Sequence, residues 1–339
     1  MKRKFSKISL ALGASGLLAA GLATSASAAS AAPAPSWRTV LSVPNGTASN
    51  LVSAVAATGP ASGWAFMRSG STAYERTGAT AWKKVTLPGI SGGVGHAEAS
   101  SSSNVWAAGT PTVGTGSQLD RWNGKQWTKV RAFPAGITAL SVLGPNDVWV
   151  SGGGVFHFNG RTWAQVSKNL QGASALSGSS VWAFSGEQVD FYNGRKWTAT
   201  SVARLLPTTA KEAPPFVSGI IALASNNVYA VGEGSQISAG GGPAVVLHFN
   251  GRSWSRVAVG PDVVGFGASL AADGTGGVWM VSDTHQNEQE LFHYSAGKLT
   301  VVALPTASAF SVSRIPGTSK ALVGGFFGAD VDSVVLQQS

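Results

Sequence analysis

The sequence predicts an all-β fold: a seven-bladed β-propeller of four-stranded antiparallel blades, closed by an N-terminal strand that completes the C-terminal blade. Three observations predict it: a Val-Trp phrase that recurs along the chain, an Asn-Gly-x-x-Trp phrase that follows most of its copies, and two chain ends that complement each other. Self-similarity at such a period is typical of repeat architectures. No stretch of a dozen residues keeps a helical period, so a repeat built from helices fits poorly.

The first phrase predicts a strand that is buried on both faces. In Val148-Trp149-Val150 all three residues are apolar, as expected of a strand that lies between neighbouring sheets rather than facing water. Its copies lie at residues 104–109, 146–152, 180–183, 227–232 and 277–281, with a degenerate copy at 64–66. These copies mark strand B of each unit.

The second phrase predicts a β-hairpin. Asn-Gly between aromatic-rich runs favours a tight turn, because both residues accept the positive φ angles of a type I′ turn. Its copies lie at residues 122–127, 158–163, 192–197 and 249–254. An apolar run such as 137–142 precedes strand B, so each unit contains four strands, A to D. The tryptophans of strand B recur roughly every 33 to 50 residues, which brackets the length of four-stranded blades.

Six full units and two complementary ends account for seven blades. The units span approximately residues 51–89, 93–136, 137–171, 172–215, 216–262 and 263–307. After them, residues 309–312, 320–325 and 333–337 match strands A, B and C, and strand D is missing. Residues 36–40 supply it, because Trp37 and Val40 repeat the Trp-x-x-Val spacing of strand D. Such an exchange would close the ring and cover the apolar faces and the sheet edge of an open array.

The first residues predict export. Basic residues precede an apolar stretch at 8–22 that ends in Ala26-Ser27-Ala28, the pattern of a secretory signal peptide. We therefore expect a signal peptide at 1–28, a short linker at 29–35, the propeller at 36–339, and a secreted, extracellular protein. No later segment offers the roughly 18 to 20 uninterrupted apolar residues of a membrane span. The chain contains no cysteine, so packing rather than disulfides must stabilise an exported fold.

The charge of the chain disfavours nucleic acid as a partner. Four of the basic residues that give the net charge of +9 belong to the predicted signal peptide, which leaves +5. The remaining cations recur in phase with the hairpin turns, as at Lys125, Arg161 and Arg195, and no basic groove interleaved with stacking aromatics is visible. We expect no nucleic-acid binding.

Both phrases together resemble the Val-Trp-Ala-Val-Gly and Asn-Gly-x-x-Trp repeats of secreted actinobacterial β-propeller proteins. They are also similar to relaxed kelch and Asp-box hairpins, although the Ser-x-Asp part of an Asp box is absent. The resemblance covers nearly the whole chain after residue 35. It implies the fold specifically and the function weakly, because propellers of this kind include lectins, adaptors, inhibitors and enzymes. Some are lectin subunits of larger secreted particles.

Length variation falls on one face of the predicted ring. The B–C loops and D–A connections of four-stranded blades emerge on one face, and the A–B and C–D turns emerge on the other. The irregular segments are the B–C loops 109–117, 232–243, 282–290 and 324–333 and the D–A connection 201–216. Variable loops on a rigid scaffold are where recognition normally occurs, and drift in unconstrained loops is the alternative.

Two features of this face are candidate ligand contacts. The loop that begins at Asp283 is a dense polar cluster, and its side chains could bind sugar hydroxyl groups or do acid–base work; a solvated loop is the alternative. Adjacent phenylalanines cannot both point inward from a strand, so one of Phe326 and Phe327 should be exposed and available for stacking; burial in the central channel is the alternative. The predicted ligand-binding residues are Asp283, His285, Asn287, Glu288, Phe326 and Phe327.

We predict no metal site and no cofactor. His157, His248 and His293 occupy the same strand-C position in three separate units, where other units place Glu75, Arg121 and Phe191, so we interpret this position as structural. A metal site needs ligands that converge on one ion. Asp330 and Asp332 lack the longer run of oxygen ligands and the glycine of a calcium loop.

The sequence favours a secreted, non-catalytic binding module of lectin-like or adaptor type. Its partner would be a glycan or a secreted or cell-surface protein, bound through the B–C and D–A loop face, by the chain alone or as a subunit of a larger secreted complex. The alternative is an extracellular carbohydrate-active enzyme, a hydrolase or lyase, with Asp283, His285, Glu288 and Glu290 as acid–base groups. A third alternative is a purely structural surface protein. Whether the central channel is open does not follow from the sequence.

Overall fold

The computed structural model describes residues 36–44, 51–111, 116–208, 213–236, 241–283, 289–305, 307–327 and 332–339, with Asp283 and Ala307 described by their backbone only. Residues Pro35–Ser339 form one compact unit. The predicted signal peptide and linker lie outside the described residues, and so do parts of all five predicted variable segments.

The described chain is built from strands, with a single 3-10 turn at Ala203–Leu205. One sheet contains β2 (Val52–Gly59), β3 (Ser62–Met67), β4 (Thr72–Arg76) and β5 (Trp82–Thr86). The next contains β6 (Val94–Ser101), β7 (Asn104–Gly109), β8 (Ser117–Trp122) and β9 (Trp127–Phe133). The third contains β10 (Ala139–Gly144), β11 (Asp147–Ser151), β12 (Val155–Phe158) and β13 (Trp163–Ser167). The fourth contains β14 (Gln171–Ser177), β15 (Ser180–Ser185), β16 (Gln188–Tyr192) and β17 (Trp197–Ser201).

Two further sheets complete the fold. A seven-stranded sheet contains β18 (Phe216–Ala224), β19 (Asn227–Glu233), β20 (Gly242–Phe249), β21 (Trp254–Ala272), β22 (Val278–Asp283), β23 (Gln289–Ser295) and β24 (Lys298–Val302). The last contains β25 (Ala307–Arg314), β26 (Ala321–Phe327), β27 (Ser333–Gln338) and β1 (Trp37–Val43). All strand pairs within these sheets are antiparallel, and the first four predicted units match the first four sheets to within one residue, at Gln171.

The structure has six sheets where the sequence suggested seven blades. The difference arises at β21, a continuous strand of 19 residues. Its first part, up to Val263, pairs with β20 as strand D of the fifth unit, and from Val264 onward it pairs with β22 as strand A of the sixth unit. Two units expected to be separated by a connection are therefore joined by hydrogen bonds into one sheet.

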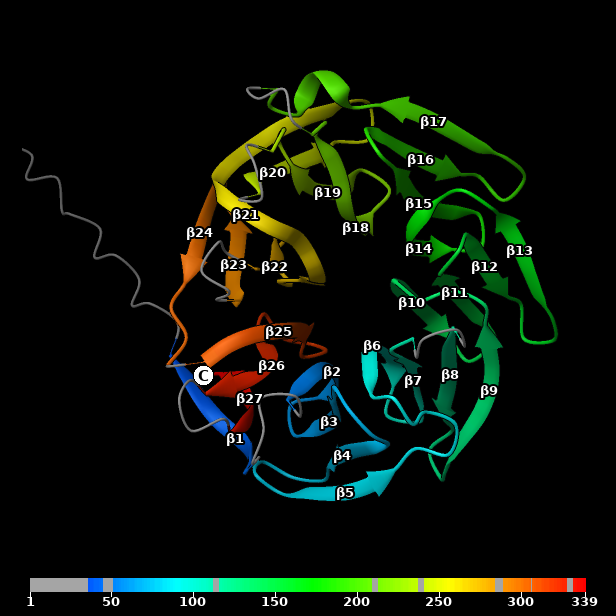
Figure 1. The fold of residues 1–339 in the computed structure, drawn as a ribbon, viewed down its shortest axis with the longest axis vertical. Helices are drawn as coiled ribbons and strands as arrows, with labels where there is room; N and C mark the ends of the chain where they lie inside the picture. Colours follow the sequence, from blue (N-terminus) through cyan, green and yellow to red (C-terminus); the bar gives the residue numbers. More distant parts are fainter. Residues whose placement is uncertain are drawn as a thin grey trace, which may run out of the picture. The chain divides into compact units, whose positions relative to one another are not determined.

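The first strand of each unit lies innermost. The strands β2, β6, β10, β14, β18, β21 and β25 contact one another in this order, and β25 also contacts β2. Figure 1 shows these strands around a central opening, with the strand-D edges on the outside. Side chains and backbone of all seven strands line a channel of about 570 Å³.

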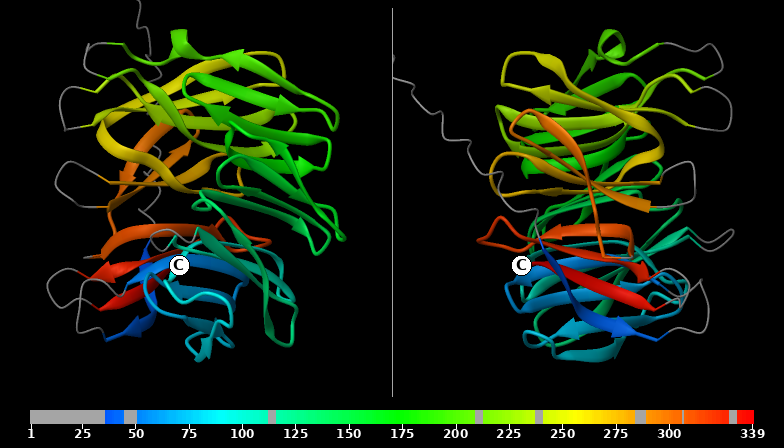
Figure 2. Two further views of the ribbon diagram at one scale, coloured as in Figure 1. Left: turned by 45° about the vertical axis from the view of Figure 1, so that its right-hand side comes forward. Right: turned by 90° about the vertical axis from the view of Figure 1, so that its left-hand side faces the viewer.

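The two ends of the described chain share one sheet. Strand β1 pairs with β27 from Trp37 opposite Gln338 to Val43 opposite Ser333, and the Ser339 N–H donates to the carbonyl oxygen of Ser36 at 2.8 Å. Figure 2 shows β1, in blue, beside the red strands of the C-terminal sheet. This pairing is the one that the sequence predicted for the two ends.

Tryptophans join neighbouring sheets. The strand-D tryptophan of one sheet meets the strand-B tryptophan of the preceding sheet edge-to-face, an arrangement that stabilises beyond area burial alone. The ring centroids are 5.0 Å apart for Trp64 and Trp127, 6.3 Å for Trp106 and Trp163, 5.7 Å for Trp182 and Trp254, and 6.0 Å for Trp279 and Trp37. Trp37, on β1, therefore makes for the C-terminal sheet the contact that its equivalents make elsewhere.

The Asn-Gly phrases form hairpins, but the predicted type I′ geometry is wrong. Gly124 has a φ of 89°, whereas Ala296 is the one non-glycine residue with positive φ in the described chain. Asn123 instead uses its side chain: its Oδ1 accepts hydrogen bonds from the N–H groups of Lys125 and Gln126, both at 3.0 Å. The loop thus spans four residues between the paired Trp122 and Trp127. The amide of asparagine closes the turn locally, so only the glycine needs a left-handed backbone.

Candidate functional site

The channel wall is built from side chains that reach from one sheet to the next. The innermost strand of each sheet has a free edge, and its unpaired N–H groups need acceptors. Ser141 Oγ accepts the N–H of Ala175 at 3.0 Å, and Ser174 Oγ accepts the N–H of Ala222 at 2.9 Å. Ser313 Oγ accepts the N–H of Ala57 at 3.0 Å. Each serine lies directly opposite the strand-B tryptophan of its own sheet, or opposite Leu322 in the last sheet.

We call the residue opposite the strand-B aromatic the clamp position, because it can hold the N–H group of the next sheet. Its occupants are Ala56, Glu98, Ser141, Ser174, Ile221, Ala271 and, opposite Leu322, Ser313. Glu98 accepts a hydrogen bond from the N–H of Val142, as serine does in three other units. Six units therefore carry a small or apolar clamp residue, and one carries a carboxyl group.

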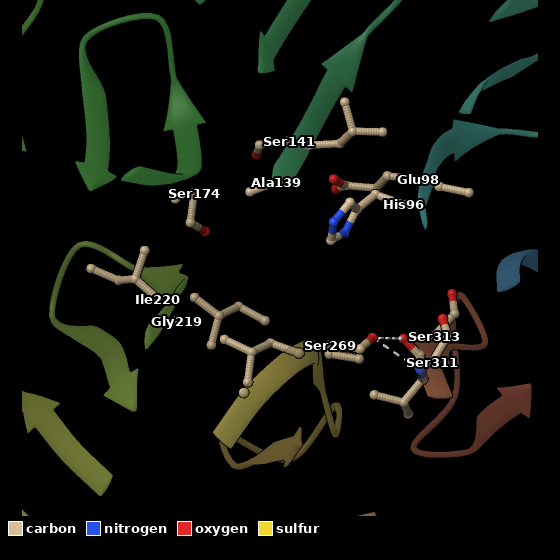
Figure 3. A pocket seen from close by; sticks show the side chains of 18 of the residues that line it. His96, Glu98, Ala139, Ser141, Ser174, Gly219, Ile220, Ser269, Ser311 and Ser313 are labelled. Carbon is tan, nitrogen blue, oxygen red and sulfur yellow. Dashed lines mark hydrogen bonds between the residues drawn. The ribbon is translucent and has the colours of Figure 1, made fainter. Parts of the chain in front are cut away.

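A second unusual side chain, His96, lies two residues before Glu98 on the same face of β6. The equivalent ladder positions hold alanine, glycine or serine in five units, and Gln171 in the fourth, where β14 is bulged. Figure 3 shows His96 and Glu98 side by side, extending from β6 into the cavity. Both side chains are half-buried.

Burial shifts the pKa values of this pair in opposite directions. Desolvation lowers the pKa of His96 to about 4, so its imidazole is neutral at neutral pH. Desolvation raises the pKa of Glu98 to about 7, and the hydrogen bond from Val142 opposes this rise in part. Neither residue stands out in the sequence, because each fits an ordinary strand pattern. A comparison of equivalent positions between the repeats would have singled them out.

A second cluster, which we call the aromatic mouth, contains Arg68, Phe310 and Phe326 and lies on the side of the B–C loops. Phe310 lines the channel, and its ring centroid lies 5.7 Å from that of Phe326. The guanidinium carbon of Arg68 lies 5.6 Å from the Phe310 ring centroid, and Arg68 is exposed. Cation–π contact holds such a cluster together while leaving part of the rings available.

Phe326 and Phe327 both belong to β26 rather than to a loop, and both are half-buried. Their side chains take alternate sides of the strand: Phe326 meets Phe310, and Phe327 packs against the core that contains Ala309 and Val334. The expectation that one of them is exposed is therefore wrong. Phe326 remains part of the aromatic mouth.

The structure leaves the predicted polar loop largely undescribed. The backbone of Asp283 pairs with Val264 and Gln289. Its side chain lies outside the described residues, as do His285, Asn287 and Glu288, and also Asp330 of the weak calcium candidate. Asp332 accepts a hydrogen bond from Ser42 Oγ at 3.1 Å.

The three strand-C histidines lie in separate units, as predicted, although His248 and His293 share the seven-stranded sheet, and each has a local partner. The ring centroid of His157 lies 4.1 Å from that of Trp149, and the centroid of His293 lies 3.8 Å from that of Trp279, both nearly parallel. The Nε2 atoms of His157, His248 and His293 lie 2.9 to 3.0 Å from side-chain oxygens of Asp147, Asn227 and Asp273, in that order. In the part of the chain that the structure describes, no three His, Asp or Glu side chains gather as a metal site.

Comparisons with known proteins identify the fold. No family model matches the chain, and no curated protein matches it. Among solved structures, the chain is similar to the RRP9 WD40 repeats, with a TM-score of 0.63, 11% identity and coverage of 90% of this chain and 98% of that one. It is also similar to YCF48 bound to D1 peptide, with a TM-score of 0.55, 12% identity and coverage of 89% and 94%.

A third similar structure is an enzyme. It is a catalytically inactive variant of virginiamycin B lyase from Staphylococcus aureus with Quinupristin, with a TM-score of 0.60, 9% identity and coverage of 90% of this chain and 100% of that one. Within the described residues, no helix is long and apolar enough to cross a bilayer. The repeated antiparallel sheets and these neighbours together show that the chain has a β-propeller fold.

Proposed function

We propose that the chain is a secreted, non-catalytic binding propeller of lectin-like or adaptor type, which recognises a glycan or a secreted or cell-surface protein. The proposal includes seven blades: β21 serves two of them, and β1 completes the last. The order of contacts among the seven inner strands supports this count. The signal-peptide pattern of residues 1–28 supports export.

The aromatic mouth is the observation that carries the proposal. It lies on the side from which the predicted variable loops emerge, beside the channel opening. Aromatic faces bind sugar rings or fill pockets on protein partners, and arginine next to them is typical of interaction hot spots. Of the similar propellers, one is described bound to a peptide and one with Quinupristin. The scaffold therefore accommodates partners of different chemistry.

Binding by the secreted chain tests this function. Wild-type protein is applied to a glycan array and used to capture proteins from culture supernatant, in parallel with Phe326→Ala and Arg68→Ala. We expect a ligand in one of the two assays, and a loss of about tenfold or more in affinity for each variant. Arg161→Ala, which changes an exposed turn residue on the other face, is the control and should bind as the wild type does.

Two outcomes would contradict the proposal. Absence of a ligand from both assays would remove the support for a binding module, and undiminished binding by Phe326→Ala and Arg68→Ala would remove the aromatic mouth as its site. The enzyme alternative stays a prediction, because most of its acid–base residues lie outside the described chain. Activity on polysaccharides that disappears in Glu288→Gln or Glu290→Gln would favour it.

A further inference from the structure

Glu98 differs from the clamp residues of the other units, because it places a carboxyl group in a half-buried position, which lowers stability when that group is ionised. At the equivalent clamp position Ser141, Ser174 and Ser313 hold the neighbouring N–H without introducing a charge. Glu98 accepts the same kind of bond, from Val142, and also places a carboxyl group in the channel. Burying a carboxylate is unfavourable unless a counter-charge accompanies it. Because serine holds the equivalent N–H in three other units, the bond to Val142 does not explain why this position is glutamate. The carboxyl group must serve another purpose.

The protein itself supplies little counter-charge at this point. His96 is the titratable neighbour on β6, and desolvation keeps its imidazole neutral at neutral pH. Arg314 also lines the channel, but its Nε donates to the carbonyl oxygen of Thr318 at 2.8 Å, at the A–B turn of its own sheet. Above the raised pKa of Glu98, the channel therefore combines a carboxylate with a neutral acceptor nitrogen.

Further acceptors and an apolar wall complete the cavity. Ser141 and Ser311 Oγ accept backbone N–H groups and retain lone pairs and protons of their own. Other inner strands contribute Ile220 and Leu270 to the lining. Figure 3 shows His96 and Glu98 on one side of the cavity, with Ser311 and Ser313 below them and Ile220 across the space. A volume of about 570 Å³ falls in the range of small-molecule sites.

We propose that Glu98 and His96 form a binding site in the channel for a small organic ammonium ligand. The carboxylate of Glu98 neutralises the ammonium group, and the ring nitrogen of His96 and the channel hydroxyl groups accept its remaining N–H bonds. The body of the ligand lies against a lining of hydroxyl groups and apolar side chains. This site is distinct from the aromatic mouth and does not depend on the function proposed for that surface.

Three matched probes test the site at pH 8. D-glucamine, D-sorbitol and D-gluconate share a linear polyhydroxy body and differ in one end group: ammonium, hydroxyl or carboxylate. An alkyl ammonium keeps its proton at this pH. Isothermal titration and saturation-transfer NMR on the full mature chain should show saturable binding of glucamine, with sorbitol and gluconate at least tenfold weaker.

Glu98→Ser is the informative variant, because serine at this position preserves the bond between sheets in three other units. It should weaken glucamine binding by tenfold or more while circular dichroism stays unchanged. Glu187→Gln removes a half-buried carboxylate that does not line the channel and should bind as the wild type does. Equal binding of sorbitol, stronger binding of gluconate, no binding of glucamine, or undiminished binding by Glu98→Ser would each overturn the proposal. Phe326→Ala, which tests the aromatic mouth, should leave glucamine binding intact.

Discussion

At the residue scale, one strand-C position shows how the repeats tolerate different side chains. It lies opposite the strand-B aromatic and holds His157, His248 and His293 in three units. In two others it holds Arg121, whose guanidinium carbon lies 5.3 Å from the Trp106 ring centroid, and Phe191, whose ring lies 4.8 Å from that of Trp182. Each of these groups is planar and covers an aromatic ring. In these five units the position holds a planar side chain, and histidine adds a hydrogen bond.

Substitutions of His293 separate the contribution of ring stacking from that of the hydrogen bond. His293→Phe keeps a ring over Trp279 and loses the bond to Asp273, which still accepts from Thr275 and from the N–H of Gly277. We expect His293→Ala to lower the free energy of unfolding by about 1–2 kcal/mol and His293→Phe by clearly less. Urea denaturation measures both values. Equal losses in the two variants would mean that stacking contributes nothing here.

Glu98 predicts a pH-dependent stability. Its pKa is raised in the folded state, from 4.5 to about 7, so the folded protein holds this proton more tightly than the unfolded chain does. The resulting stabilisation is present below pH 4.5 and is lost as the pH rises through 7. His96 acts oppositely: its pKa is lowered from 6.5 to about 4, so stability is lost as the pH falls through that range.

Glu98→Gln isolates the effect of the Glu98 charge on stability, because glutamine cannot ionise and can still accept a hydrogen bond from the N–H of Val142. The variant should match the wild type at pH 4 and exceed its free energy of unfolding at pH 8 by about 1–2 kcal/mol, which allows for screening of a half-buried group. Thermal unfolding at pH 4, 6 and 8 measures the difference. An advantage that is the same at pH 4 and pH 8 would contradict the assigned shift.

At the scale of single elements, β1 stabilises the C-terminal sheet. It covers the edge of β27 and places Trp37 edge-to-face on Trp279 of the preceding sheet. Deletion of residues 36–44 should lower the melting temperature sharply or abolish secretion, because it exposes a strand edge and an apolar face.

Trp37→Ala tests the aromatic part alone. It should cost about 2 kcal/mol, less than a fully buried tryptophan, because Trp37 is half-buried. Differential scanning calorimetry should show a melting temperature lowered by several degrees. Arg38→Ala, an exposed neighbour on the same strand, is the control and should change it little. An unchanged melting curve for the deletion would contradict the role of β1.

The sequence predicts these elements well where a repeated residue has a repeated contact. The tryptophans of strands B and D mark the sheets because each occupies the same inter-sheet contact. The hairpins follow from Asn-Gly, but the turn geometry does not, since the asparagine side chain takes over the role of a second left-handed residue. The continuity of β21 was also missed, because no residue pattern distinguishes a connection from a strand that pairs on both sides.

The candidate site was harder to predict. Phe326 was identified through its unusual neighbour, whereas its partners Arg68 and Phe310 lie far away in the sequence. His96 and Glu98 escaped notice because their significance lies in the contrast with Ser141 and Ser174 at equivalent positions of the channel.

At the scale of the whole molecule, the channel and the loop face exist only if the two ends of the described chain meet. The inner strands contact one another in sequence order, and β25 returns to β2. Because each sheet buries its faces against its two neighbours, the seam between the last and first units needs the same side-chain contacts as the others. Val55 and Ala57 meet Ser311 and Ser313 there through hydrogen bonds of 3.0–3.1 Å.

The pairing of β1 with β27 can be measured directly, because the chain contains no cysteine. Arg38 lies directly opposite Gln337, and such antiparallel partners have Cα atoms close enough for a disulfide. The double variant Arg38→Cys, Gln337→Cys should form an intramolecular disulfide in the folded monomer, seen by mass spectrometry and on non-reducing gels, whereas Arg38→Cys with Ser201→Cys should not. Folded protein in which Cys-substituted positions 38 and 337 keep free thiols under oxidising conditions would contradict the closure of the ring.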